Sequence, residues 1–297
     1  MNIIKWGLLG MTGLALFVCE EINAAEMPNT SADAVSVPMV TAQPEIFLQT
    51  QKCIRQKEDR ERCYQMDLYT LKTNIDWIDP YFQKAARSLL KFDSYTLSNR
   101  EIKEKQAQWD KLPVDKLKKE FIENVERLFD NDDVMPVGYS LEYKPRFLAQ
   151  NNQLAMFVTY YYAFTGGAHG IYGTSFYNFD LKTKKLLDLD DILLPGKKRE
   201  FAELLREAYL EYISVVESEP DQAKAEQRLL EREDRGWIAE PTDNFAFVYN
   251  GLLLDYLPYM LGSFAEGEIQ LLIPYSRLTD IVKPEYLFNT TKTIISE

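Results

Sequence analysis

The sequence predicts an α+β fold, in which antiparallel sheets pack with helices in two subdomains. Segments rich in aromatic and β-branched residues gather at 139–181 and 244–273, and each group follows a stretch with helical periodicity. The 297 residues also include 18 Tyr and 16 Phe, which suits sheets with aromatic faces. Because strands and helices are segregated along the chain, the pattern favours α+β over α/β.

The first 25 residues read as an export signal. Lys5 precedes an apolar run from Trp6 to Val18, and the small residues Ala24 and Ala25 follow. The apolar run is shorter than the ~20 residues of a membrane span. We therefore expect an exported protein, periplasmic or at the cell surface. The alternative is a lipoprotein acylated at Cys19, although the preceding Leu-Phe-Val matches the bacterial lipobox poorly.

Beyond the signal, residues 26–46 are rich in Pro, Ser, Thr and Ala and predict a flexible lead-in. We expect an N-terminal subdomain over 47–175 and a C-terminal subdomain over 176–297. Cys53 and Cys63 are predicted to form a disulfide, because an exported chain enters an oxidising compartment. The bridge would contribute ~2–3 kcal/mol. A metal site is the alternative, but two cysteines without a nearby histidine fall short of the usual four ligands.

The first half should hold one strand and then helices. Residues 64–71 alternate as a strand does, and a helix should follow with Asp79 as its N-cap and Pro80 in its first turn. Residues 98–129 are helical in pattern and interrupted at Pro113. One apolar face of this region carries Leu117, Phe121, Val125 and Leu128.

The second half predicts an antiparallel meander over 139–181, then two helices within 196–218 and 219–237. Next come a hairpin turning at Asn250-Gly251, one more strand, and a short helix from Pro274 or Tyr275. The first of the two helices has an apolar face made of Phe201, Leu204, Leu205, Tyr209 and Ile213.

The only histidine, His169, lies in the sequence GGAHG. Gly166 and Gly167 permit a sharp turn with positive φ. A catalytic base needs a nucleophile and an orienting group, and a zinc ligand needs partners, but the chain has no HExxH or GxSxG motif. We therefore favour a structural or ligand-contact role for His169 over catalysis.

Acidic residues give no specific site. Asp188, Asp190 and Asp191 could bind a hard cation, but they lack the loop glycine and the spaced oxygens of a calcium loop. Carboxylate pairs for glycoside hydrolysis have many candidates among 46 acidic residues, which is abundance rather than a signal. No cofactor and no metal is predicted.

A second cluster is the sequence YLPYMLGSFAEGE, whose aromatic residues lie in a stretch that cannot be a regular strand. Exposed Tyr and Phe in a rigid loop suit a binding hot spot, whereas the alternative is that they fill the core. The expected contact residues of both loops together are Gly166, Gly167, His169, Tyr172, Pro258, Tyr259, Ser263, Phe264 and Gly267.

The formal net charge of −12 argues against nucleic-acid binding, which needs a basic surface. Acidity gives an advantage with basic partners, although it also serves solubility alone.

Three segments resemble one family, namely YQMDLYTLKTNIDWID, then the GGAHG loop with YNFDLKTKKLLDLDDIL, then FAFVYNGLLLDYLPYMLGSFAEGEIQLLIPYS. They are similar to the extracytoplasmic region of RsiV-type anti-sigma factors, which is shared with the N-terminal domain of PdaC-type deacetylases. The resemblance covers about residues 60–285. It implies a two-subdomain α+β fold and, from RsiV, recognition of lysozyme through the external region. It does not imply catalysis, since PdaC chemistry belongs to a separate domain.

Only five residues precede the apolar run, so we expect no sigma-factor binding. The function that follows from the resemblance is an exported, non-catalytic envelope protein that binds lysozyme or a cell-wall-related ligand. Two alternatives stay open: a cell-envelope glycan hydrolase that uses carboxylates, and a structural or assembly module. Contact with a membrane is expected only through a lipid anchor at Cys19.

Overall fold

The computed structural model describes residues 37–55, 61–90, 108–129 and 138–288, all within one compact unit, Val37–Glu297. The predicted signal over 1–25, the predicted cleavage site and Cys19 lie outside the described residues. The division into subdomains at 175 and 176 stays a prediction.

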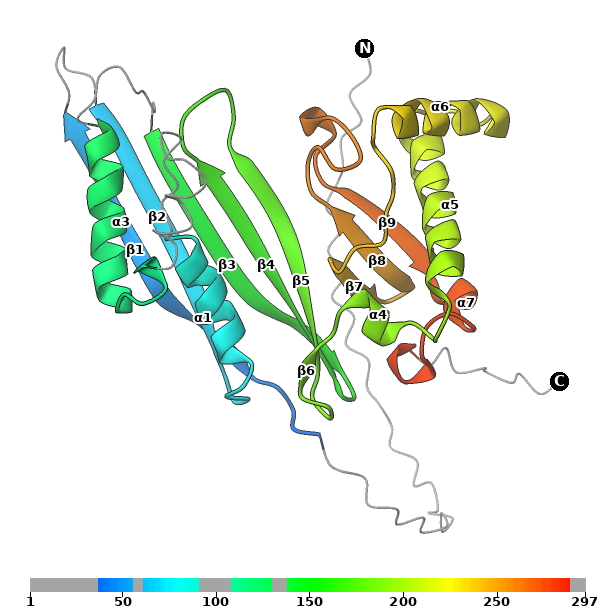
Figure 1. The fold of residues 1–297 in the computed structure, drawn as a ribbon, viewed down its shortest axis with the longest axis horizontal. Helices are drawn as coiled ribbons and strands as arrows, with labels where there is room; N and C mark the ends of the chain where they lie inside the picture. The colour runs from blue at the N-terminus through cyan, green and yellow to red at the C-terminus, as the bar shows by residue number, and fades with distance from the viewer. Residues whose placement is uncertain (1–36, 56–60, 91–107, 130–137, 289–297) are drawn as a thin grey trace, which may run out of the picture. The chain divides into compact units, whose positions relative to one another are not determined.

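The larger sheet has six strands in the spatial order of the sequence (Figure 1). Neighbours pair antiparallel, as expected for the meander, except that β2 and β3 run parallel. The expectation of purely antiparallel sheets is therefore wrong for this pair. The strands are β1 (Ala42–Arg55), β2 (Glu61–Thr73), β3 (Gly138–Asn151), β4 (Leu154–Phe164), β5 (Ile171–Asp180) and β6 (Lys185–Leu186).

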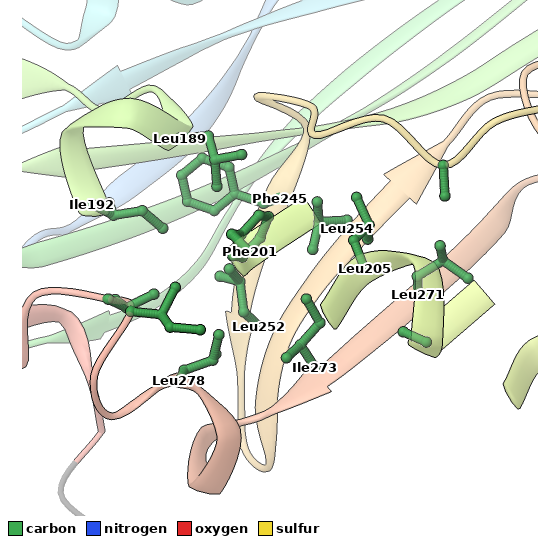
Figure 2. Close-up of a cluster of buried hydrophobic side chains, with 14 of the residues drawn as sticks. Leu189, Ile192, Phe201, Leu205, Phe245, Leu252, Leu254, Leu271, Ile273 and Leu278 are labelled. Carbon is green, nitrogen blue, oxygen red and sulfur yellow. The ribbon is translucent and has the colours of Figure 1, made fainter. Parts of the chain in front are cut away.

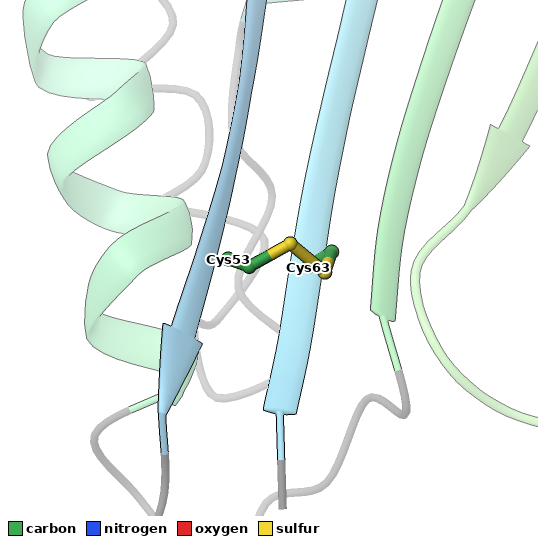
Figure 3. The surroundings of a disulfide bond; sticks show 2 residues. All are labelled: Cys53 and Cys63. Carbon is green, nitrogen blue, oxygen red and sulfur yellow. A yellow bond between two sulfur atoms is a disulfide. The ribbon is translucent and has the colours of Figure 1, made fainter.

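Strand β1 has no counterpart in the sequence prediction and begins at Ala42, inside the expected lead-in. It forms a hairpin with β2, in which Cys53 lies directly opposite Cys63. The two cysteines form the predicted disulfide (Figure 3). The bond therefore fixes the register of the edge strand of the sheet.

Helices α1 (Asp79–Ser88) and α3 (Val114–Phe129) cover one face of this sheet (Figure 1). The apolar stripe of α3 is buried against β2 and β3, with Leu117, Phe121 and Val125 as predicted. Its fourth buried residue is Phe129, whereas the predicted Leu128 is only partly buried. The N-cap of α1 is Ile78, not Asp79. The buried Asp79 carboxylate instead accepts hydrogen bonds from Thr73 N at 2.9 Å and Thr73 Oγ1 at 2.6 Å, which ties the helix to the end of β2.

The C-terminal elements form a second layered core. Strands β7 (Phe245–Val248), β8 (Gly251–Tyr256) and β9 (Ile269–Pro274) make an antiparallel sheet, and α5 (Lys198–Val216) packs on it. Figure 2 shows Phe201 and Leu205 of α5 facing Phe245, Leu252 and Leu254. The other elements are α4 (Leu189–Ile192), α6 (Gln222–Asp234), η2 (Phe264–Glu266), α7 (Tyr275–Leu278) and η3 (Pro284–Tyr286).

The β7–β8 hairpin turns one residue earlier than predicted. Val248 pairs with Gly251, so Tyr249 and Asn250 form the two-residue turn. Gly251 is the first residue of β8, and a Cβ on it would lie 2.3 Å from the carbonyl oxygen of Ile273. The glycine is therefore needed for close approach of β9 rather than for the turn. Among the described residues, no helix has the length and apolar character to cross a membrane.

Candidate functional site

The two loops singled out in the sequence meet in the structure. Residues 165–170 join β4 to β5, and residues 257–268 join β8 to β9. The His169 ring stacks on Phe264 with centroids 3.7 Å apart, and its Nε2 lies 3.2 Å from Tyr259 Oη. The Tyr172 ring meets Phe264 edge-on at 5.7 Å. We call His169, Tyr172, Tyr259 and Phe264 the aromatic cluster.

The hydrogen bonds of His169 define its tautomer. Its Nδ1 lies 3.0 Å from the carbonyl oxygen of Gly170, which can only accept. Nδ1 therefore carries a hydrogen, and in the tautomer that this bond selects Nε2 accepts from Tyr259 Oη. Gly166 and Gly167, with φ of 97° and 102°, supply the turn that brings His169 to this position.

Tyr259 has a strained backbone. Met260 N donates to Leu257 O at 3.0 Å, which makes Leu257–Met260 a turn with Pro258 and Tyr259 at its centre. Tyr259 has a φ of 74°, a conformation that costs a residue other than glycine ~1–2 kcal/mol. The residue is nevertheless 59% exposed. A large aromatic side chain is thus held outward at a position that favours glycine, and strain of this kind gathers at functional sites.

The second loop is fixed from below by polar contacts. Ser263 N donates to Glu266 Oε1 at 2.8 Å in a capping box, and Arg232 donates to Glu266 Oε2 at 2.7 Å. Partial burial raises the pKa of Glu266, but the hydrogen bonds from Ser263 and Arg232 outweigh it and lower the pKa below its ordinary value. Tyr209 Oη, buried in the core, donates to Leu261 O at 2.6 Å. Both sides of Phe264 along the chain are therefore anchored.

A polar junction beneath the cluster joins β5 to the smaller sheet. The Asn244 side chain accepts from Phe176 N at 2.9 Å and donates to Thr174 O at 2.9 Å. It also donates to the Asp255 carboxylate at 3.1 Å. Glu268 is the last residue of the second loop. Its carboxylate accepts hydrogen bonds from the Thr174 backbone N–H and, at 3.1 Å, from the Thr174 hydroxyl. These bonds hold the two loops in a fixed position relative to each other.

Asp255 in this junction is 1% exposed, and burial raises its pKa to about 6, with the nearby Glu268 carboxylate adding to the rise. Because this pKa lies above the value in the unfolded chain, the folded state binds the proton more tightly than the unfolded state does. The contribution to stability is full below pH ~4 and is lost as pH rises through about 6, with a total of about 3 kcal/mol.

Lowering the pH from about 7.5 to about 5 should raise the free energy of unfolding of the wild type by about 1–1.5 kcal/mol more than that of Asp255→Asn. Urea unfolding of both proteins at the two pH values measures this difference. A constant difference would contradict the raised pKa. Asp190→Asn, which changes an exposed carboxylate on α4, is the control and should behave like the wild type.

The contacts of His169 are all with neighbours in the two loops. Its partners among the described residues are a hydroxyl, a carbonyl and a ring, with no carboxylate hydrogen-bonded to it. Asp188 and Asp191 form the capping box of α4, and Asp190 pairs with Lys198 at 2.9 Å. Within the described ranges, no three His, Cys, Asp or Glu side chains gather in a way that could hold a metal ion.

Comparison with known protein families gives a match for the second loop of the site but not for the first. Residues 190–276 match a family model described as a protein of unknown function, DUF3298. The DUF3298 match contains Tyr259, Ser263, Phe264 and Gly267 but neither His169 nor Tyr172. No curated protein matches the chain.

Two solved structures of DUF3298 proteins share the fold. One, from Pseudomonas aeruginosa, has a TM-score of 0.55 and 20% identity, over 84% of this chain and 96% of that one. The other, from Bacteroides fragilis, has a TM-score of 0.54 and 17% identity, over 84% and 95%. At these identities the likeness concerns the fold, which is α+β as predicted. The narrower RsiV-type or PdaC-type assignment stays a prediction.

The structure thus places most predicted contact residues around one cluster. Gly267 lies at its base, where a Cβ would be 3.3 Å from Tyr172 Oη. The sequence reasoning did not single out Arg232, Asn244 or Asp255, which support the loops from outside them. A signal for part of this support was present, since Ser263 and Glu266 have the spacing of a capping box.

Proposed function

We propose that this protein is an exported, non-catalytic binding protein of the cell envelope and that the aromatic cluster is its recognition surface. The observation that carries the proposal is Tyr259, whose exposed ring is held at a strained backbone position and is hydrogen-bonded to His169. Rigid aromatic side chains that lose little entropy on binding are typical of interaction hot spots.

A basic protein is the partner that we propose, with animal-type lysozyme as the specific candidate. The resemblance to the external region of RsiV-type proteins supports lysozyme. The net charge of −12 favours fast encounter with a basic partner and predicts an affinity that falls with salt. The second loop adds Glu266 and Glu268 and contains no Lys or Arg between 257 and 268.

Titration of the purified protein against a c-type lysozyme at two salt concentrations tests the partner. Variants then test the surface. Tyr259→Gly should lower the affinity by about tenfold or more, as removal of a hot-spot aromatic does. Its folding stability should be unchanged or higher, because glycine relieves the positive φ.

Tyr249→Ala is the matched control. Tyr249 is 96% exposed in the β7–β8 turn, at the opposite end of β8 from Tyr259. Its removal should leave the affinity unchanged. Equal affinities of wild type and Tyr259→Gly would contradict the proposed surface, and the absence of binding by the wild type at either salt concentration would contradict the proposed partner.

A further inference from the structure

A cavity of about 280 Å³ opens between the C-terminal end of α5, the helix α6 and the residues Ser263 and Glu266 at η2. Its lining shares Arg232, Ser263 and Glu266 with the support of the second loop. None of the lining residues belongs to the aromatic cluster, so a ligand of this cavity can be sought independently of the recognition surface.

The floor of the cavity is rigid. Arg232, with a side chain only 11% exposed, donates to Leu261 O at 3.2 Å, to Glu217 at 3.3 Å and to Glu266 at 2.7 Å. These three bonds come from separate segments of the chain. The guanidinium therefore fixes the Glu217 and Glu266 carboxylates, and a ligand would meet their remaining lone pairs already ordered.

The rim alternates hydrogen-bond donors and acceptors. The Arg228 side chain lies 3.4 Å from a Glu217 oxygen and 3.1 Å from a Glu231 oxygen. Trp237 adds an indole, with the guanidinium carbons of Arg232 and Arg235 at 5.7 Å and 5.8 Å from its ring centroid. Three arginines thus face three glutamates around one aromatic side chain.

We propose that this cavity binds a sugar ring of a saccharide. Each sugar hydroxyl both donates and accepts, so a lining of fixed guanidinium donors and carboxylate acceptors can satisfy several hydroxyls at once. The indole offers an apolar surface for the C–H groups of the ring. The balanced charge of the lining disfavours a strongly anionic ligand, because such a ligand would meet three carboxylates. An apolar ligand would desolvate the charged groups without offering them a hydrogen bond.

The volume agrees with a small ligand. Cavities for drug-sized molecules occupy ~300–1,000 Å³, and this one lies just below that range. The site would hold one ring, with the rest of the saccharide extending into solvent.

Titration of the full protein with chitotriose, with maltotriose and with inorganic phosphate, followed by calorimetry and by indole fluorescence, tests the proposal. We expect saturable binding of at least one of the two saccharides. Glu231→Gln and Trp237→Leu should each weaken it by about tenfold, because each removes a partner of the ring. The carboxylate of Glu231 lies at the rim, so Glu231→Gln keeps the fold even if Trp237→Leu does not.

Glu203→Gln, which changes an exposed carboxylate on α5, is the control and should leave the affinity unchanged. The proposal is overturned if neither saccharide saturates up to about 50 mM, a concentration well above a dissociation constant of about 1 mM. It is also overturned if phosphate alone binds, or if Glu231→Gln and the control behave alike. Because lysozyme is absent from this experiment, its outcome is independent of the recognition surface proposed above.

Discussion

Replacement of Phe201 by alanine is expected to lower the free energy of unfolding by about 3–5 kcal/mol, the usual cost of removing a buried phenylalanine. Phe201 is fully buried where α5, α4 and the β7–β8 hairpin meet (Figure 2). Its loss leaves a cavity that the surrounding strands can fill only in part. Urea unfolding followed by circular dichroism measures the effect.

Val215→Ala on the same helix is the matched control. Val215 is 76% exposed, so its truncation should change the stability by less than about 0.5 kcal/mol. Similar midpoints for Phe201→Ala and the control would mean that α5 does not pack on the sheet as described.

Gly251→Ala is expected to destabilise the protein by about 3 kcal/mol, at the upper end of the cost of overpacking. The added Cβ would lie 2.3 Å from the Ile273 carbonyl oxygen and 2.9 Å from its carbon, so β8 and β9 would have to separate. Backbone atoms cannot move aside as a flexible side chain can. Thermal and urea unfolding of the variant measure the effect.

Gly236→Ala separates this steric effect from that of backbone conformation. Gly236 has a φ of 85° with open space around a Cβ, so its replacement should cost only about 1 kcal/mol. Gly251 does not adopt a positive φ. Equal losses in the two variants would contradict the close approach of β8 and β9.

The elements predicted best from the sequence are those with a strong local signal. The apolar stripe of α5 and the β3–β4–β5 meander follow from periodicity, which burial on one face imposes directly. Strand β1 gave no such signal because it lies at the edge of the sheet, where most of its side chains are exposed. The hairpin turn was misplaced because Asn-Gly is a frequent turn pair. Here Gly251 lies in β8, where it allows the close approach of β9.

The candidate site was predicted only in part, because the residues that join its two loops give no local signal in the sequence. The two loops stand out by their aromatic and glycine content, but their contact depends on Asn244 and Glu268, which join β5 to the smaller sheet. Charged and amide residues are too abundant for such tertiary roles to be visible in the sequence. Arg232 likewise resembles any solvated helical arginine until its contacts with Glu266 and Leu261 are known.

The parallel pairing of β2 with β3 has a consequence for how fast the protein folds. Within the larger sheet, β1 and β2 are neighbours along the chain, as are β3, β4 and β5. Each group can therefore form through contacts between residues that are close in sequence. The β2–β3 ladder instead joins residues such as Cys63 and Gly138, across the segment that carries α1 and α3. Closing that long loop costs chain entropy before any pairing energy is gained, and high contact order slows folding. Formation of this single ladder is therefore expected to set the folding rate of the sheet.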